Sequence, residues 1–473
     1  PKKVKAVYEQ LGVSTLADLE AACRAGKVAH LEGFGPKTQE NILKGIERLQ
    51  THAGRFLLSD ALPLALDLRA ALAHHSAVRR VEVVGSLRRH RETVEDIDLL
   101  ASAADPAALT RAFATHPLVA EVLAHGPTKA SVRLQGGIQA DLCVVADDEF
   151  PFALHHSTGS MEHSVAMRNR AIARGLKMNE YGLFEGETLL PCRDEAAIFE
   201  RLGLAYIPPE LREDLGEIEA AERGAIPALV EEGDLTGTFH CHTTWSDGLN
   251  SLEEMAAATR QMGYAYLGIA DHSEAARYAG GLTRQQVAEQ HAAIERLNAT
   301  FRDFRLLKGI EADILADGAL DYDEETLRRF DYVVASVHSR FAMDAASMTA
   351  RLVKALSHPR LTMLGHVSGR LLLQREPYAF DLEAVLQAAA RHGVVVEINA
   401  NPRRLDLDWC HLRRARELGI LLAINPDAHS TEGLRDTVYG VGVARKGWCT
   451  KSDILNARPL PEVMAFLARR KAA

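Results

Sequence analysis

The pattern of hydrophobic positions changes character twice in the first third of the chain. Apolar residues recur at helical spacing up to about residue 55, in LADLEAACRAG and, after the turn GFGPKT, in QENILKGIERLQ. An alanine-rich apolar stretch at 59–75 predicts one more helix. Beyond it, VRRVEVVGS, EDIDLLAS and KASVRLQGGIQADLCVV read as strands, with one helical segment, ALTRAFATH, between them. The pattern predicts a helical region followed by an α+β unit.

The second half of the chain has a regular rhythm. Residues 151 to about 215 mix a helix, MEHSVAMRNRAIARG, with short strands, and residues 216–235 have the Pro, Gly and acidic composition of a linker. From 236 to 473, seven apolar runs alternate with amphipathic helices: GTFHCH, YLGIAD, RLLKGIEAD, DYVVASVH, TMLGHV, GVVVEINA and ILLAINPDAH. Seven strand-then-helix units predict a closed parallel barrel, one unit short of the usual eight, with its functional site where the strands end.

Composition narrows the class of protein. A chain of 473 residues is too long for one ordinary core, and 47% hydrophobic with 25% charged residues is typical of a soluble globular protein. Without a long uncharged apolar run or a signal-peptide profile, a cytoplasmic location is the default expectation. The six cysteines form no CxxC pair, which argues against a disulfide framework and against a thiolate zinc site. The formal charge of -9 argues against nucleic-acid binding by the whole surface but leaves room for a local basic groove.

The first residues, PKKVKAVYEQL, echo the later stretch PKTQENILKGI that begins at Pro36. The later copy follows a Gly-Phe-Gly turn, whereas nothing precedes the first copy. We therefore expect residues 1–58 to be a helical region that is truncated at its N-terminus.

Histidines and carboxylates stand at the ends of the apolar runs from 236 onward. They are His240, His242, His272, Glu311, His338, His366, Asp427 and His429, with Asp247 in the loop after the first run. In a strand, His240 and His242 would share one face. Charges grouped at one end of a barrel would repel and desolvate one another unless cations bind there. Nitrogen and oxygen ligands without thiolates suit Zn²⁺, Mn²⁺ or Fe, and neighbouring metal ions are a common solution for splitting phosphate esters.

These residues carry a family resemblance. The segment from about 236 to 473 resembles a polymerase and histidinol phosphatase (PHP) domain, a distorted (β/α)7 barrel with three metal ions, and all nine ligand positions of that family are filled here. The resemblance implies one metal held by His240, His242, Glu311 and Asp427 and a second held by Glu311, His338 and His366. It implies a third metal held by Asp247, His272 and His429, and an active site.

A second group of polar residues lies in the α+β unit. A Gly85-Ser86 turn is followed by Arg89, then by Asp96 and Asp98, and later by Asp141. Asp96 and Asp98 share a face of a strand, and a third carboxylate on an adjacent strand would complete a site for two Mg²⁺ ions. The turn can offer backbone N–H groups to a phosphate, and an arginine adds a bidentate grip.

This group resembles the palm (59–150) and thumb (151–215) of family X DNA polymerases, the family of DNA polymerase beta. The resemblance implies Asp96, Asp98 and Asp141 as catalytic residues with Mg²⁺ or Mn²⁺. It also implies nucleotide contacts at Gly85, Ser86, Arg89 and Gly159, and DNA contacts at Arg168 and at the helix-hairpin-helix residues Gly33, Gly35 and Lys37 of the fingers region (1–58). The order of these parts is that of bacterial family X polymerases.

The chain departs from the family pattern at three places. Glu95 replaces a glycine, His156-Ser157 replaces an aromatic pair, and Ser164 replaces an asparagine. All three positions lie on the nucleotide side of the expected site, and a carboxylate at Glu95 would repel a triphosphate. We therefore expect weak or altered nucleotide incorporation.

The sequence thus predicts a multidomain DNA repair enzyme: helix-hairpin-helix region, α+β polymerase palm and thumb, linker, and PHP barrel. We expect template-directed gap filling in base excision repair, metal-dependent 3′–5′ exonuclease action and 3′-end processing. Expected partners are gapped or 3′-recessed duplex DNA and deoxynucleoside triphosphates, with no membrane, a nucleoid-associated cytoplasmic location and a monomeric state. One alternative is a PHP nuclease whose polymerase half only binds DNA gaps. A phosphatase of the histidinol-phosphate type is disfavoured by the DNA-binding elements.

Overall fold

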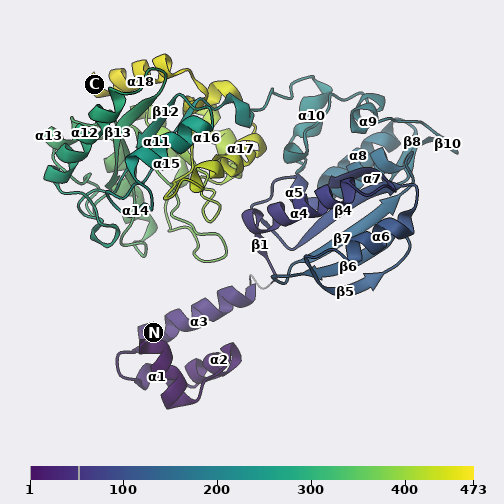
Figure 1. The fold of residues 1–473 in the computed structure, drawn as a ribbon, viewed down its shortest axis with the longest axis horizontal. Helices are drawn as coiled ribbons and strands as arrows, with labels where there is room; N and C mark the ends of the chain where they lie inside the picture. The colour runs from purple at the N-terminus through teal and green to yellow at the C-terminus, as the bar shows by residue number, and fades with distance from the viewer. Residues whose placement is uncertain (1, 52–53, 473) are drawn as a thin grey trace. The chain divides into compact units, whose positions relative to one another are not determined.

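The computed structural model describes residues 2–51 and 54–472. The chain divides into two compact units, each described by itself. The first comprises Pro1–Phe56 with Leu373–Arg375, and the second comprises Leu57–Leu372 with Glu376–Ala473. Figure 1 shows the first unit as a group of helices and the second as strands and helices of the palm, thumb and barrel.

The first unit is helical, as the sequence predicts. Its helices are α1 (Lys2–Leu11), α2 (Leu16–Arg24), the short η1 (Val28–His30) and α3 (Pro36–Thr51). A capping box starts α2: the Thr15 side chain accepts the Asp18 N–H, and the Asp18 side chain accepts the Thr15 N–H. Ala22, Cys23 and Val28 form the small buried core. The turn residues Gly33 and Gly35 precede α3, and Lys37 lies exposed in its first turn.

A five-stranded sheet forms the palm, in the order β2-β4-β7-β6-β5. These strands are β2 (Val78–Val83), β4 (Asp96–Ala103), β5 (Val119–His125), β6 (Lys129–Leu134) and β7 (Gln139–Val145). The other palm elements are β1 (Phe56–Leu57), α4 (Leu58–Ala73), α5 (Gly85–Arg88), β3 (Thr93–Val94) and α6 (Pro106–Ala114). Helix α4 packs on β2 and β4, and α6 packs on β5, β6 and β7. β4 and β7 run parallel, whereas the other pairs of the sheet are antiparallel.

Two details of the palm differ from the expectation. The run KASVRLQGGIQADLCVV is a hairpin of β6 and β7, because the chain turns at Gly136 and Gly137, both with positive φ. The strand pattern also missed β5, whose residues after Val119 are all exposed. An edge strand without buried side chains lacks the apolar alternation on which the prediction depends.

The thumb follows with α7 (Phe150–Thr158), α8 (Met161–Ala173), a three-stranded antiparallel sheet and α9 (Glu195–Arg201). The strands of this sheet are β8 (Leu176–Asn179), β9 (Gly182–Glu185) and β10 (Thr188–Leu189). The Ser160 side chain caps α8 by accepting the His163 N–H at 3.2 Å. Buried side chains from α7, α8, β9 and α9 share one core, which includes Phe152, Met167, Leu183 and Phe199.

The segment expected to be a linker, 216–235, is partly packed. It contains the helix α10 (Glu217–Glu222) and the short helix η3 (Glu232–Asp234). The short helix η2 (Pro209–Leu211) precedes this segment and ends the thumb. Glu217 is fully buried, and its Oε1 lies 2.7 Å from His163 Nδ1. Val230 is buried in the core of the barrel. The acidic composition that indicated a linker therefore includes a carboxylate that is paired inside the fold.

Seven parallel strands in sequential order form the third part of the chain. They are β11 (Gly237–Cys241), β12 (Tyr266–Ile269), β13 (Arg305–Asp313), β14 (Tyr332–Ser336), β15 (Met363–Leu364), β16 (Val395–Asn399) and β17 (Leu422–Asn425). Residue Cys241 bridges Ala428 in parallel, which brings the first and last strands together. The sheet is therefore a nearly closed barrel, and the predicted distorted (β/α)7 fold is confirmed.

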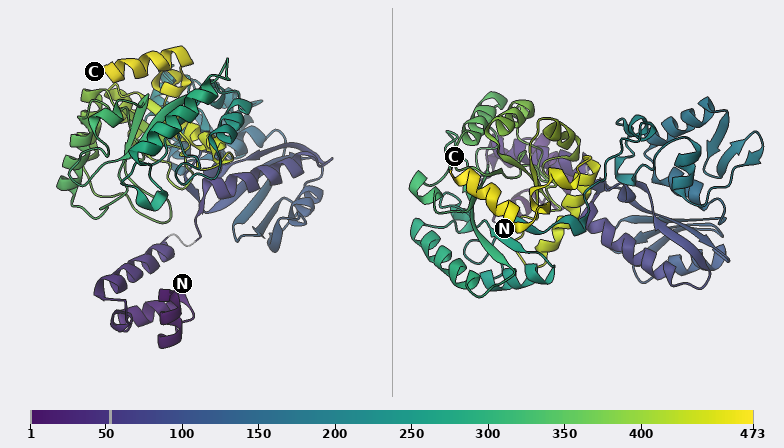
Figure 2. Two further views of the ribbon diagram at one scale, coloured as in Figure 1. Left: turned by 60° about the vertical axis from the view of Figure 1, so that its left-hand side comes forward. Right: turned by 90° about the horizontal axis from the view of Figure 1, so that it is seen from above.

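Helices surround the barrel strands, as Figure 2 shows. They are α11 (Leu252–Gln261), α12 (Arg284–Asn298), α13 (Glu324–Leu327), α14 (Ala345–Leu356), α15 (Leu382–His392), α16 (Trp409–Glu417), α17 (Thr437–Lys446) and α18 (Leu460–Ala472). The short helices are η4 (Arg277–Ala279), η5 (Gly433–Asp436), η6 (Lys451–Asp453) and η7 (Leu455–Ala457). Among the described residues, no helix combines the length and apolar character needed to cross a membrane.

Charged side chains join the barrel to the palm and thumb inside the second unit. Lys446 at the end of α17 is fully buried, and its Nζ contacts the Glu213 carboxylate and lies 3.1 Å from the Arg89 carbonyl. The neighbouring Arg445 Nε lies 2.7 Å from Glu210 Oε1. These contacts reach the turn that follows α5, where the sequence places a nucleotide contact.

Arg370 makes a second charged contact between the barrel and the palm. It is buried, with its Nη1 2.5 Å from Asp408 Oδ2 and its Nη2 against the carboxylate of Glu92. Burial raises the pKa of Glu92 to about 7, although Arg370 acts in the opposite direction. We call these buried ion pairs, centred on Arg370, Arg445 and Lys446, the palm–barrel contact.

Candidate metal centres in the palm and barrel

All nine ligands predicted for the barrel come together at the carboxyl ends of its strands. His240 belongs to β11 and Glu311 to β13, while the remaining ligands follow β11, β12, β14, β15 and β17. The ligand atoms form four overlapping groups, each within 4.8 Å. The groups are His242, Asp247, His272 and His429; His240, His242 and Glu311; His240, His366 and Asp427; and His272, Glu311 and His338. We call these nine residues the barrel cluster.

The grouping by distance overlaps with the three sets that the resemblance implies, without reproducing them. Asp247, His272 and His429 share a group in both. His366 is grouped with His240 and Asp427, yet its Nε2 also lies 2.9 Å from Glu311 Oε1. His272 joins two groups, because its Nδ1 lies 3.0 Å from Glu311 Oε2. The four distance groups within the barrel cluster therefore share residues with one another and do not form three separate sets.

Glu311 is the centre of the cluster. It is 1% exposed, and its Oε1 lies 3.2 Å from His240 Nε2 and 3.3 Å from His338 Nε2. Burial alone would raise its pKa, but the imidazoles of His338, His240 and His272 hold the pKa well below its ordinary value. Glu311 is thus an anionic carboxylate at physiological pH, as a metal ligand must be.

Backbone strain accompanies three of the ligands. His240, His366 and Asp427 all have positive φ, at 55°, 20° and 51°. The pairing register of β11 shifts between Thr238 and Cys241, so His240 and His242 do not reach the cluster by regular strand alternation. The sequence argument assumed a straight strand, which the structure does not show, and the assignment of His240 and His242 as ligands stays a prediction. Strained backbone at side chains that converge on one point is typical of functional sites.

Several imidazole nitrogens of the cluster fit a metal. His242 Nδ1, His242 Nε2, His240 Nε2 and His366 Nδ1 are buried and make no hydrogen bond within the described part of the chain. Burial, with His429 and His272 nearby, lowers the pKa of His242 to about 3, so this imidazole is neutral. Neutral imidazoles and anionic carboxylates are the donor set of Zn²⁺, Mn²⁺ or Fe. Cys241 is buried, and its Sγ lies 3.5 Å from the Phe239 carbonyl.

A second layer of carboxylates orients the ligands, and the sequence argument did not identify it. Glu397 in β16 is fully buried; its Oε1 lies 2.5 Å from His240 Nδ1 and its Oε2 accepts the His366 N–H at 2.7 Å. Asp313 Oδ1 lies 2.7 Å from His338 Nδ1. The available signal was a carboxylate inside each of the apolar runs GVVVEINA and GIEAD. Such partners fix the orientation and basicity of a metal-ligating histidine.

Arg404 is another residue that the sequence argument missed. Its Nε lies 3.4 Å from Asp427 Oδ2, and its Nη1 is buried without a hydrogen bond in the described residues. A guanidinium beside a cluster of metal ligands can hold a phosphate oxygen.

In the palm, the three predicted aspartates also converge. Asp96 and Asp98 lie on β4, and Asp98 is opposite Asp141 of β7 in the parallel register. One carboxylate oxygen from each lies within 4.8 Å of the others. Burial raises the pKa of Asp98 to about 6, and the charges of Asp96 and Asp141 add to the effect. Cations bound between the three carboxylates would remove this repulsion, so the palm triad fits Mg²⁺ or Mn²⁺.

The predicted nucleotide contacts lie beside this triad. Gly85 has φ of 66°, and a Cβ there would collide with the Asp98 carboxylate. Ser86 follows it in α5 and is half-buried. Arg89 donates to the Thr158 carbonyl, directly before Gly159, and its Nε lies 3.2 Å from Glu213 Oε1. The guanidinium expected to face a triphosphate is therefore held by the thumb.

The three departures have different surroundings. His156 and Ser157 line a pocket of about 450 Å³ together with Asp98 and Asp141. Glu95 is exposed, and its charge contributes to the raised pKa of Asp96. Ser164 is 7% exposed. Glu95 thus acts on the charge of the triad, and His156 shares a pocket with two of its members.

The predicted DNA contacts lie on two different units. Arg168 is exposed on α8, and its Nε lies 3.4 Å from the Ser164 carbonyl. Gly33, Gly35 and Lys37 belong to the first unit, where Lys37 Nζ lies 3.0 Å from Glu40 Oε2.

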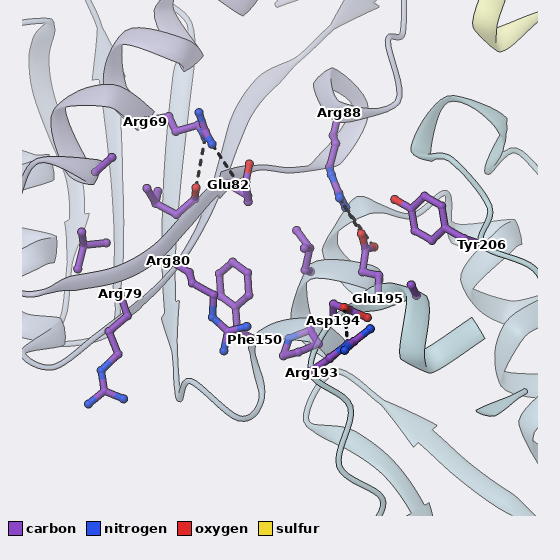
Figure 3. A pocket seen from close by; sticks show the side chains of 16 residues that line it. Arg69, Arg79, Arg80, Glu82, Arg88, Phe150, Arg193, Asp194, Glu195 and Tyr206 are labelled. Carbon is purple, nitrogen blue, oxygen red and sulfur yellow. Dashed lines mark hydrogen bonds and ion pairs between the residues drawn. The ribbon is translucent and has the colours of Figure 1, made fainter. Parts of the chain in front are cut away.

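A pocket of about 740 Å³ at the edge strand β2 contains none of the predicted site residues (Figure 3). Five arginines line it: Arg69, Arg79, Arg80, Arg88 and Arg193. Ion pairs neutralise most of them, including Arg69 with Glu82 at 3.1 Å and Arg88 with Glu195 at 2.7 Å. The predicted site residues lie instead in the smaller palm pocket and in the barrel cluster.

Comparisons with known families agree with this division. Residues 153–213 match the DNA polymerase beta thumb, and residues 238–401 match the PHP domain. A polymerase thumb after a carboxylate-bearing palm, joined to a barrel with a histidine-rich cluster, defines the class as family X polymerases with a C-terminal PHP domain.

One relative resembles the chain over nearly its whole length. The DNA polymerase/3′-5′ exonuclease PolX of Bacillus subtilis (strain 168) is 40% identical over 472 residues, which are 99% of this chain and 82% of the relative. The chain belongs to this family of bacterial family X polymerases. Probable phosphatases resemble a shorter part of the chain: one of Thermoanaerobacter sp. (strain X514) is 27% identical over 176 residues, 35% of this chain and 69% of the relative. Another, of Vibrio atlanticus (strain LGP32), is 29% identical over 201 residues, 40% of this chain and 76% of the relative.

Proposed function

We propose that this chain extends DNA primers at the palm triad and removes nucleotides from 3′ ends at the barrel cluster. The observation that carries the proposal is the presence of two complete donor sets in one chain, one of three carboxylates and one of nine histidine and carboxylate residues. The relative that aligns over 99% of the chain is named for both activities. We therefore propose polymerase activity for the palm, in preference to the alternative hypothesis of a polymerase half that only binds DNA gaps.

In the palm, the chain positions the reacting groups. Mg²⁺ or Mn²⁺ at the triad would neutralise the triphosphate and favour the ionised primer 3′ hydroxyl. Asp96 and Asp98 would hold both ions, and Asp141 would orient the primer hydroxyl for in-line attack on the α-phosphate. Gly85 lets the turn before α5 approach Asp98 closely, Ser86 extends the turn towards the triphosphate, and Arg89 offers a bidentate grip beside Gly159.

In the barrel, the nine ligands would hold three ions of Zn²⁺, Mn²⁺ or Fe. Such ions lower the pKa of a water and hold the oxygens of the scissile phosphodiester. Glu397 and Asp313 keep the imidazoles of His240 and His338 in their binding orientation. Arg404 would bind a phosphate oxygen beside Asp427. The product would be a DNA strand shortened from its 3′ end.

We assign the enzyme to DNA repair at gapped or 3′-recessed duplexes, acting as a monomer near the nucleoid. The residues Gly33, Gly35 and Lys37 of the helix-hairpin-helix would hold a DNA phosphate without reading sequence, and exposed Arg168 would contact the template. His156 in the triad pocket and Glu95 beside Asp96 support weak or altered nucleotide incorporation. The domain limits proposed for these functions are 1–58, 59–150, 151–215, 216–235 and 236–473.

The test uses a 5′-labelled gapped DNA with Mn²⁺, with and without deoxynucleotides. Wild-type protein should extend the primer when nucleotides are present and shorten it when they are absent. Asp96→Ala should abolish extension alone, and His240→Ala should abolish shortening alone. Asp67→Ala, at an exposed aspartate of α4, is the matched control and should behave as wild type. Shortening without extension by the wild-type protein would overturn the polymerase half of the proposal.

A further inference from the structure

The barrel exposes few large apolar side chains. Among the described residues from 236 to 472, Leu249 and Tyr278 are the two with exposed large hydrophobic side chains, at 77% and 72%. Both lie beside the barrel cluster, on the loops that follow β11 and β12. Exposed apolar groups that gather at one functional site, on a surface otherwise free of them, indicate a binding surface.

The Tyr278 ring lies directly beside two ligands of the cluster. Its centroid is 6.2 Å from the ring of His272 and 6.3 Å from the ring of His338. The neighbours Ala276 and Ala279 are 0% and 4% exposed, so both sides of the short η4 helix are anchored. A rigid backbone therefore presents an exposed ring next to the metal ligands.

Leu249 is fixed to the same place from the other loop. Its N–H donates to the His429 carbonyl at 2.7 Å, and it follows the ligand Asp247 by two residues. The two loops touch each other, since a Cβ on Gly280 would lie 3.5 Å from the Ser246 carbonyl. Gly281 fits only without a side chain, because a Cβ there would collide with the Ser273 carbonyl. Leu249 and Tyr278 thus lie on two loops that approach each other, and each loop carries a predicted ligand of the cluster.

We propose that Tyr278 and Leu249 form a subsite for the nucleobase next to the scissile phosphodiester. The inference rests on the proposed nuclease function, because the cluster would bind the phosphate and the attached nucleoside must then lie within a few ångströms of it. Polar ligands and metal ions offer no apolar surface to a base, whereas an exposed aromatic ring does. Base–aromatic stacking tolerates every base, which suits an enzyme that removes nucleotides without reading sequence.

The first test pairs a change in the protein with a change in the DNA. Tyr278→Ala should lower kcat/KM for 3′-end removal by about ten- to hundredfold on DNA with a normal terminal base. On DNA whose terminal nucleotide is a tetrahydrofuran residue without a base, wild type and Tyr278→Ala should have equal kcat/KM. Removing the base and removing the ring abolish the same contact, so the second removal costs nothing more. Tyr278→Phe should retain the wild-type rate on both substrates, since the ring rather than the hydroxyl is required.

Leu249→Ala should show the same dependence on the base, with a smaller loss. Leu66→Ala, at an exposed leucine of α4, is the matched control and should change neither rate. Equal losses by Tyr278→Ala on both substrates, or a Tyr278→Phe variant as slow as Tyr278→Ala, would overturn the subsite.

The second test measures binding by the metal-loaded full chain to DNA whose terminal linkage is a non-hydrolysable phosphonate, so that the cluster can bind the linkage and no cleavage occurs. A 2-aminopurine placed at the 3′ terminus should lose fluorescence when wild-type protein or Tyr278→Phe binds, because the base stacks on the ring. Tyr278→Ala should bind without this quenching, and quenching equal to wild type would contradict the proposal. A wild-type protein that quenches the probe but removes no nucleotide with Mn²⁺, Zn²⁺ or Fe²⁺ would refute the nuclease function and leave the base contact standing.

Discussion

Glu397 has no place among the expected ligands, yet it holds two of them. Its carboxylate contacts the His240 ring and accepts the His366 N–H, and Asn425 Nδ2 donates to it at 2.9 Å. Burial alone would raise the pKa of Glu397, but the neighbouring His240 lowers it, and the net shift of the pKa is downward. The Glu397 carboxylate therefore remains charged. It therefore fixes the tautomer of His240 and leaves Nε2 for a metal.

Glu397→Gln should weaken metal binding by about 10- to 100-fold, because an amide holds the imidazole less strongly than a carboxylate. Titration of the metal-free protein with Mn²⁺ or Zn²⁺, followed by calorimetry, measures the affinity. Glu383→Gln, at a partly exposed glutamate in the first turn of α15, is the matched control. Unchanged affinity in Glu397→Gln would show that the carboxylate does not tune the site.

Gly85→Ala should abolish primer extension while leaving 3′-end removal intact. A methyl group at this position would collide with Asp98, and φ of 66° is unfavourable for alanine. A displacement of about 1 Å in a reacting group can cost about 100-fold in rate. Primer extension in single turnover is the measurement, with Gly126→Ala as control because its Cβ would make only an ordinary contact. Extension at the wild-type rate would show that the turn can relax.

At this scale the sequence predicted which side chains converge but not what supports them. Strand ends in a parallel barrel meet at one edge, so spacing predicted that histidines and carboxylates at run ends come together, and the family resemblance implied the full set of nine ligands. Glu397 and Asp313 could not, because a carboxylate inside an apolar run reveals neither its burial nor its partner. The bulge at His240 was equally hidden, since a register shift depends on pairing with β12 rather than on local sequence.

Secondary-structure elements were predictable where one face is buried. All seven barrel strands are buried along most of their length and rich in apolar residues, because helices cover them outside and side chains fill them inside. Strand β5 was missed because nearly all its side chains face solvent. Helix α10 was missed because its acidic sequence resembled a linker, whereas Glu217 is buried against His163.

Helix α17 ends in Lys446, whose burial makes stability depend on pH. Burial, opposed by Glu213, lowers the pKa of Lys446 from 10.5 to about 8. Between these two values the unfolded chain binds the proton and the folded chain does not, so the free energy of unfolding increases with pH. Below pH 8 both states are protonated, and this contribution is constant.

Lys446→Met should remove that increase, which is about 1 kcal/mol per pH unit for one proton. Urea denaturation at several pH values between the two pKa values, compared with wild type, measures the difference. Lys451→Met, at an exposed lysine paired with Asp234, is the matched control and should keep the wild-type slope. The same slope in Lys446→Met and wild type would contradict the assignment.

For the whole molecule, Arg370 is the strongest link of the palm–barrel contact. It is 8% exposed and lies between Glu92 of the palm and Asp408 of the barrel. Arg370→Leu would leave two partly buried carboxylates without their cation, and the expected loss of stability is about 2–4 kcal/mol. Thermal and denaturant unfolding should show a separate, earlier transition.

Arg414→Leu provides the comparison for this prediction. Arg414 pairs with Glu383 at 2.6 Å on the barrel surface, with both side chains almost half exposed. Its loss should cost less than about 1 kcal/mol. Equal effects of the two substitutions would mean that the Arg370 contact adds nothing to stability.

The palm–barrel contact also limits how such an enzyme can be recombined. Exchanging the barrel for that of another protein would replace the barrel side of this contact together with the metal cluster. The carboxylates Glu92, Glu210 and Glu213 would then lie at the new domain interface without their cationic partners. Only a donor barrel with cations at the positions of Arg370, Arg445 and Lys446 would avoid this. A working chimera would therefore have to inherit those three side chains together with the catalytic domain.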